Sequence, residues 1–158
     1  MQTTWVKDYE ISIQEAPDYH WYSYDSKNYD KVFHLTSAED FTRTILLTIK
    51  RAHQEKKVVL VVPYYTIVDH CALPAGNRLF LMLNDLLCLF NLESLDIDKQ
   101  QKLDTIGTMF ASYPYKQDFI LYGELDIFRV TSNLSIQWQF SGKDIFVSYN
   151  DDAPAFEM

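Results

Sequence analysis

Glycine and cysteine are scarce in this sequence, which has four Gly and two Cys among its 158 residues. So few Gly leave no Gly-rich phosphate-binding loop, and neither the P-loop nor the dinucleotide-binding fingerprint is present. Cys71 and Cys88 stand alone, without the paired spacing of a zinc site and too few for a disulfide framework. The sequence therefore predicts no cofactor and no metal, and it contains no motif that indicates an enzyme.

Positive charge is in the minority, since 14 Lys and Arg stand against 22 Asp and Glu, a formal net charge of −8. Such a chain repels nucleic-acid phosphates, whose binding depends on Lys and Arg displacing counterions, so we expect no direct nucleic-acid binding. The same charge would attract a basic protein by long-range steering. It would equally keep the protein soluble, so charge alone does not decide between a binding role and simple solubility.

Long hydrophobic runs are absent as well. The most apolar stretch, 79–90, is too short to span a bilayer and contains Asn84 and Asp85. The first five residues show neither the cationic nor the apolar region of a signal peptide. We therefore expect a cytoplasmic protein with reduced thiols and no contact with membranes.

Three segments in the middle of the chain predict helices. In 36–57, Thr36 and Glu39 match a capping box, and Phe41, Ile45 and Ile49 form part of one apolar stripe at helical spacing. The segment 78–91 is apolar almost all round, which is typical of a buried helix or half of an interface. A third amphipathic helix is predicted over 97–112.

Strands are predicted on both sides of this helical block. Residues 4–14 and 20–24 could form an N-terminal hairpin, and 58–62 has the unbroken apolar pattern of a strand covered on both faces. The remainder predicts a β-meander over 119–131, 134–140 and 144–150. We therefore expect one α+β domain over 1–158, mostly antiparallel sheet with about three central helices, ending in a flexible acidic tail at 150–158.

The stretch 18–30, DYHWYSYDSKNYD, sets five aromatic side chains among three Asp. An ordinary sheet strand with one wet face would explain it, and sugar binding by stacked rings is another use of such residues. Exposed Tyr would also serve as rigid anchors while Asp meets cations on a partner. On that interpretation the partner-binding residues are Asp18, Tyr22, Tyr24, Asp25, Tyr29 and Asp30, with Asp151 and Asp152 of the tail as a second patch.

The resulting hypothesis is a small acidic binding protein that neutralises a basic partner, in the manner of an immunity protein or inhibitor of a toxin or nuclease. Nucleases need cationic grooves, which an acidic protein can find rapidly and block. Two alternatives stay open. The loop 64–78, with Asp69, His70 and Cys71, could form the centre of a small enzyme or ligand binder. The apolar helix predicted at 78–91 could instead join subunits of an assembly or homodimer.

Overall fold

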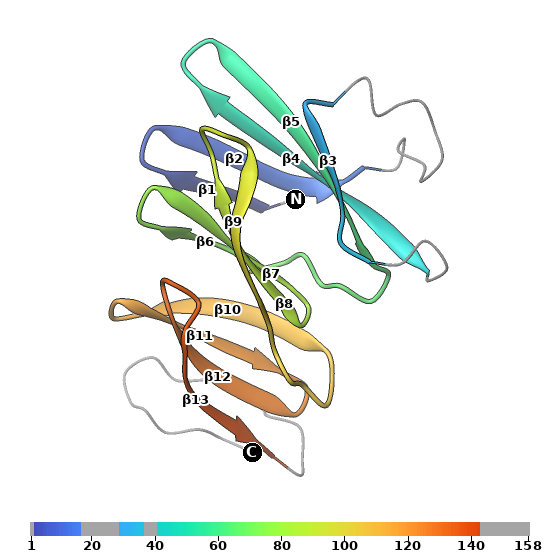
Figure 1. The fold of residues 1–158 in the computed structure, drawn as a ribbon, viewed down its shortest axis with the longest axis vertical. Helices are drawn as coiled ribbons and strands as arrows, with labels where there is room; N and C mark the ends of the chain where they lie inside the picture. Colours follow the sequence, from blue (N-terminus) through green and yellow to red (C-terminus); the bar gives the residue numbers. More distant parts are fainter. Residues whose placement is uncertain (1, 17–28, 37–40, 143–158) are drawn as a thin grey trace.

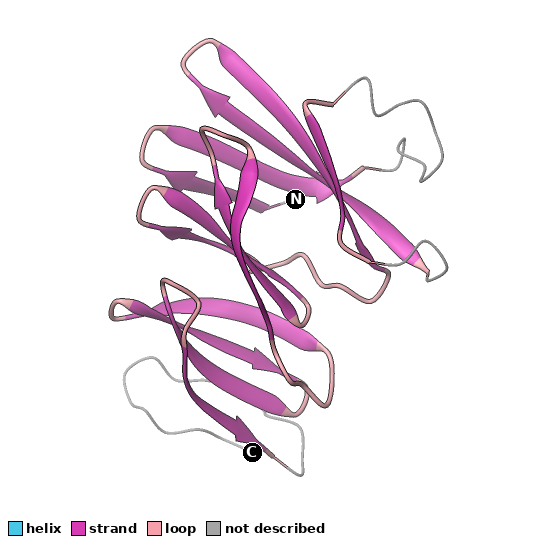
Figure 2. Cartoon of the chain, in the orientation of Figure 1, coloured by secondary structure: helices cyan, strands magenta, loops and turns pink. Residues whose placement is uncertain are grey.

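The computed structural model describes residues 2–16, 29–36 and 41–142, and throughout this part of the chain the secondary structure is β-strand and turn, without a helix (Figure 1, Figure 2). The described residues form 13 strands in three sheets. The predicted α+β class is therefore wrong, and the protein is all-β. No helix among these residues is long and apolar enough to cross a membrane.

The three sheets follow one another along the chain. Sheet A contains β1 (Gln2–Val6), β2 (Tyr9–Glu15), β3 (Lys31–His34), β4 (Thr42–Arg51) and β5 (Gln54–Pro63), in the order β1-β2-β4-β5-β3. Sheet B contains β6 (Ala72–Ala75), β7 (Arg78–Leu83), β8 (Leu86–Asn91) and β9 (Asp96–Lys102), in chain order. Sheet C contains β10 (Met109–Tyr115), β11 (Asp118–Gly123), β12 (Asp126–Thr131) and β13 (Ile136–Ser141), also in chain order. All strand pairs are antiparallel except β3 with β5.

Sheet B is the middle layer of a stack (Figure 1). Its side chains Leu79, Leu81 and Phe90 pack with the buried face of sheet A, and Phe80 and Met82 pack with sheet C. The first strand of sheet B, β6, also contacts β1 and β10, the first strands of the other two sheets. Sheets B and C are four-stranded antiparallel meanders in chain order, whereas sheet A has five strands and adds β3 parallel to β5 at one edge.

The predicted helix over 36–57 is instead the β4–β5 hairpin. Ile45, Leu47 and Ile49 alternate along β4 and are buried, and the Thr residues at 42, 44 and 48 on its other face favour a strand because they are β-branched. The prediction failed because Ile45 and Ile49 lie four residues apart, a spacing that fits both a helix face and a strand face. The hairpin turns at Ala52, whose φ is 54°. The capping residue Glu39 lies outside the described residues.

The predicted helix over 78–91 is the β7–β8 hairpin. Its apolar residues occupy both faces of the strands because sheets A and C cover sheet B from both sides. Asn84 and Asp85 form the turn, and Asn84 takes the left-handed conformation with φ 58°, which Asn tolerates better than most residues. The hypothesis of an association helix here is wrong, since the helix does not exist and these apolar side chains pack inside the chain's own core.

The predicted helix over 97–112 is divided between β9 and β10. These strands belong to different sheets, and residues 103–108 connect them. Leu103 and Met109 are buried between sheets B and C, whereas Ile106 of the connection is 68% exposed. Leu103 and Ile106, which stand at helical spacing in the sequence, therefore both belong to the connection between two strands.

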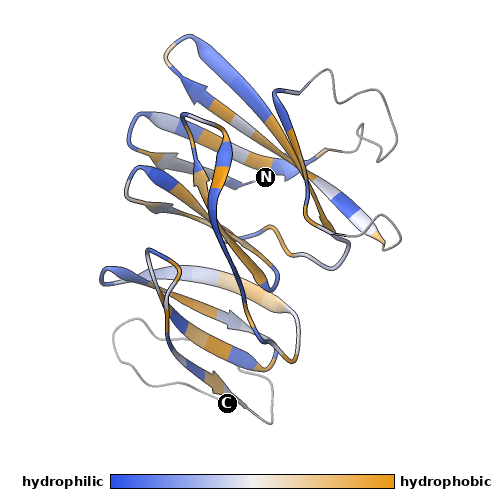
Figure 3. Ribbon diagram, viewed as in Figure 1, coloured by the Kyte–Doolittle hydropathy of each residue, from blue (hydrophilic) through white to orange (hydrophobic). Residues whose placement is uncertain are grey.

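Several strand predictions are confirmed. Val58–Val62 of β5 are fully buried, as their apolar pattern indicated, whereas the charged first half of β5 extends into solvent (Figure 3). The segment 119–131 divides into β11 and β12, and 134–140 contains most of β13. Residues 4–14 are strands but turn at Lys7 and Asp8 between β1 and β2. The predictions for 20–24, 144–150 and the tail lie outside the described residues.

The stack makes a prediction for stability. The Phe80 ring is fully buried between sheets B and C and lies 4.5 Å from the Phe119 ring, centroid to centroid. We expect Phe80→Ala to lower the free energy of unfolding by about 3–5 kcal/mol, because it removes contacts and leaves a cavity. Ile106→Ala, at an exposed position, should change it by about 0.5 kcal/mol or less. Denaturant titration of both variants measures the difference, and equal effects would contradict the stacked core.

Candidate functional site

The described part of the chain is almost neutral. It holds 12 Lys and Arg and 14 Asp and Glu, a net charge of −2, whereas the remaining residues hold 2 and 8, a net charge of −6. Most of the acidic excess therefore belongs to 17–28, 37–40 and 143–158. The stacked sheets themselves provide little electrostatic attraction for a basic partner.

Most carboxylates of the sheets have structural partners. Seven of the 14 carboxylates lie in ion pairs: Asp8, Glu15, Asp85, Glu93, Asp96, Asp98 and Asp118. The least exposed of these pairs joins Arg129 to Asp118, nitrogen to oxygen, at 2.8 Å. The buried Asp126 accepts hydrogen bonds from the Ile106 amide and the Ser141 hydroxyl. Most of these acids therefore already have a partner within the chain, and most of the pairs are exposed to solvent.

Two residues of the predicted tyrosine surface can be placed. Asp30 joins β5 to the start of β3, since its carboxylate accepts a hydrogen bond from the Lys57 amide and its own amide donates to the Lys57 carbonyl, both at 2.8 Å. Tyr29 is half-buried and packs with Val59 and Val61 on the outer face of sheet A. Both positions thus have a structural role. The other predicted partner-binding residues lie outside the described residues: Asp18, Tyr22, Tyr24, Asp25, Asp151 and Asp152.

The loop 64–78 does not assemble the chemistry proposed for Cys71. Burial raises the pKa of the Cys71 thiol to about 12, which leaves it protonated at neutral pH. The His70 side chain is exposed and its ring lies 5.9 Å from the Tyr113 ring, while its carbonyl accepts hydrogen bonds from Ser112. Within the described ranges, no three His, Cys, Asp or Glu side chains come together as metal ligands.

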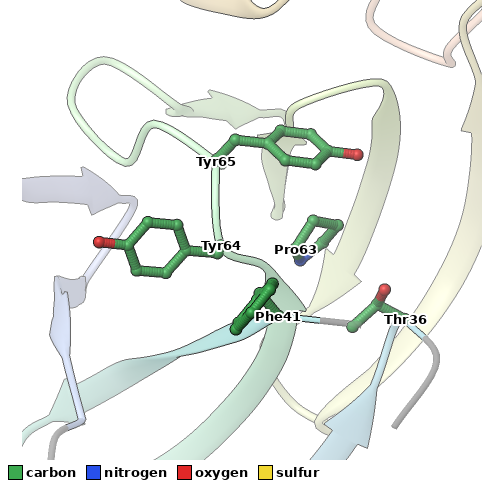
Figure 4. Close-up of a pocket in the computed structure, with 5 residues that line it drawn as sticks. All are labelled: Thr36, Phe41, Pro63, Tyr64 and Tyr65. Carbon is green, nitrogen blue, oxygen red and sulfur yellow. The ribbon is translucent and has the colours of Figure 1, made fainter. Parts of the chain in front are cut away.

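The same loop begins with the most exposed aromatic cluster of the described chain. Phe41 is 89% exposed, Tyr64 69% and Tyr65 56%. With Thr36 and Pro63 they line a hollow of about 630 Å³, and Figure 4 shows the Tyr64 and Tyr65 rings on opposite sides of the backbone with Phe41 beside Pro63. We call Phe41, Tyr64 and Tyr65 the aromatic cluster and the space around it the aromatic hollow.

Strand pairing positions this cluster. Thr42 at the start of β4 lies opposite Pro63 at the end of β5, so Phe41 and Tyr64 come together just beyond the last pair of the hairpin. The Tyr64 amide donates a hydrogen bond to the Phe41 carbonyl at 3.0 Å. The backbone after the cluster is also held, because Arg43 donates to the Thr66 carbonyl at 2.6 Å and pairs with Glu15. The exposed rings therefore stand on a well-anchored backbone.

A second hollow of about 400 Å³ adjoins the first and shares Thr36, Pro63 and Tyr65 with it. It runs between the end of sheet A and the β7–β8 turn of sheet B. Its lining includes four apolar residues, Leu35, Val62, Leu83 and Leu86, and three polar ones, Asp85, Gln100 and Lys102. We call the two neighbouring hollows together the groove, with an aromatic end at Phe41 and Tyr64 and a polar end at Asp85, Gln100 and Lys102.

Sequence reasoning missed this groove for an identifiable reason. Phe41 fitted the apolar stripe of the predicted helix and was therefore assigned to the core. Tyr64 and Tyr65 directly follow a buried strand at Pro63, and this pair of neighbouring rings at a strand end was the available signal. Only the β4–β5 pairing shows that Phe41 joins them.

No model of a protein family matches the chain, and no curated protein sequence matches it.

The reactivity of the two thiols tests whether Cys71 is an inert, buried residue. Burial also raises the pKa of Cys88 to about 12. Both folded-state pKa values lie above the pKa of an unfolded thiol, which is about 8.5. The stability that the two thiols contribute is therefore fully present below about pH 8.5 and is lost as the pH rises towards about 12. In the native protein at pH 8 we expect neither thiol to react with an aromatic disulfide reagent until denaturant is added. Rapid reaction of the Cys88→Ala variant, in which Cys71 is the only thiol, would contradict the assignment.

Proposed function

We propose that this protein is a binding protein without catalytic function, which neutralises a basic protein partner as an immunity protein or inhibitor does. The observation that carries the proposal is the aromatic cluster of Phe41, Tyr64 and Tyr65 on an anchored backbone. Clusters of exposed apolar side chains mark interaction sites, and Tyr is among the residues that contribute most to binding energy.

The proposal gives the two kinds of feature different tasks. The aromatic cluster supplies contact area, since rings bury a large apolar surface at a small entropic cost. The acidic residues outside the described ranges, among them Asp18, Asp25, Asp151 and Asp152, supply the attraction that accelerates encounter. The partner is therefore expected to be basic, and a cationic groove of a toxin or nuclease has that character.

Photo-crosslinking tests the contact. Tyr64→p-benzoylphenylalanine places a reactive group in the aromatic cluster, and Trp5→p-benzoylphenylalanine is the matched control because Trp5 is 57% exposed on β1 of the same sheet. In lysate of the native host we expect the Tyr64 variant to crosslink one basic protein and the Trp5 variant to give little of it. Identical products from both positions, or none from Tyr64, would reject the aromatic cluster as the contact.

Charge reversal tests the steering. Once the crosslinked protein is purified, Asp18→Lys together with Asp25→Lys should slow its association about tenfold or more at low salt and flatten the dependence of that rate on salt. Tyr64→Ala should instead increase the dissociation rate. An association rate that is unchanged in the double variant would remove the electrostatic half of the proposal and leave the aromatic contact intact.

A further inference from the structure

The polar end of the groove presents a carboxylate at a fixed place. Asp85 lies in the two-residue turn between β7 and β8, and its carbonyl accepts a hydrogen bond from the Leu103 amide at 2.7 Å. The neighbouring Asn84 accepts one from the Met109 amide at 2.9 Å. The backbone of the turn is therefore tied to the chain on both sides, and Asp85 lines the second hollow.

Within the chain, the Asp85 carboxylate forms an ion pair with Lys102 that is long and largely exposed. Lys102 lies 3.7 Å from Asp85, nitrogen to oxygen, and its side chain is 75% exposed whereas that of Asp85 is 27% exposed. An exposed pair at this distance contributes little to stability, because water screens it and the long Lys side chain loses entropy in forming it. An incoming cation can therefore replace Lys102 at Asp85 at small cost.

We propose that the groove binds an extended segment of the partner that carries an apolar side chain and, close to it in sequence, an Arg or Lys. The apolar side chain enters the aromatic hollow beside Tyr65, and the cation pairs with Asp85 across the shared wall of Thr36 and Pro63. This inference rests on the proposed function and names what the partner presents to the groove.

The choice of a basic segment follows from charge and rigidity. Asp85 lies on an anchored turn and its side chain is 27% exposed, whereas that of the longer Lys102 is 75% exposed, so less entropy is lost when a partner binds the carboxylate than when it binds Lys102. Arg would suit it best, because guanidinium can donate two parallel hydrogen bonds to one carboxylate and can also stack on a Tyr ring. The net charge of −8 favours approach of the same kind of segment.

The experiment is an NMR titration of the full-length protein with short peptides. The probes are acetylated, amidated peptides with Phe and Arg separated by none, one or two Gly, and the controls have Glu in place of Arg. We expect the best Arg peptide to shift the amide signals of Tyr65, Asp85 and Gln100, and to bind about two- to fivefold more tightly than its Glu counterpart, the range of an exposed ion pair.

Two variants with the same change of charge make the result specific. Asp85→Asn should abolish the preference for Arg, whereas Asp69→Asn, at an exposed carboxylate outside the groove lining, should preserve it. The inference is overturned if Arg and Glu peptides bind equally, if the preference survives Asp85→Asn, or if no peptide shifts signals in the groove. Peptide failure alongside a specific crosslink at Tyr64 would reject the basic segment alone, whereas loss of the crosslink rejects the proposed function itself.

Discussion

Burial of both faces of sheet B is the constraint on which the rest of the structure depends. Leu79 and Phe90 face sheet A while Phe80 and Met82 face sheet C, so one sheet contributes side chains to both main cores. Each such side chain contributes about 1.5–3 kcal/mol when fully buried. Sheets A and C each depend on sheet B for a covered face. The groove depends on it too, because the β7–β8 turn and β9 of sheet B supply Asp85, Gln100 and Lys102 to its lining.

This double burial also explains what the sequence could and could not predict. Val58–Val62 was recognised as a covered strand because it is short, β-branched and ends at Pro63. The pattern of 78–91 predicts a helix although the segment is a hairpin, because an antiparallel strand covered on both faces loses the polar–apolar alternation that normally identifies it. Asn84 then looked like a polar interruption of a helix, whereas it is the turn. Ile45 and Ile49 predict a helix for a different reason, because a spacing of four residues fits both the period of a helix and the two-residue period of a strand.

For the candidate site, too, the sequence predicts features that depend on composition and misses those that depend on contacts between distant residues. The acidic, tyrosine-rich character of the chain was visible in its composition, and the partner's basic character remains a hypothesis drawn from it. Asp30, predicted as a surface anion, is exposed and also pairs with the backbone of Lys57. The aromatic hollow could not be predicted, because Phe41 and Tyr64 meet only through the pairing of Thr42 with Pro63. The described sheets thus have a nearly neutral net charge and carry an exposed aromatic cluster, whereas most of the acidic excess belongs to the remaining residues.

Hydrogen–deuterium exchange of the whole protein, followed by mass spectrometry of its peptides, tests the central position of sheet B most directly. Amides of a strand enclosed by two sheets exchange only when a large part of the structure opens. We predict that peptides covering 79–90 exchange more slowly than those covering the polar edge strand β9 (Asp96–Lys102), whose side chains are mostly exposed. Exchange over 79–90 that is as fast as over β9 would show that sheet B is not enclosed, and would contradict the stack of sheets and the groove built on it.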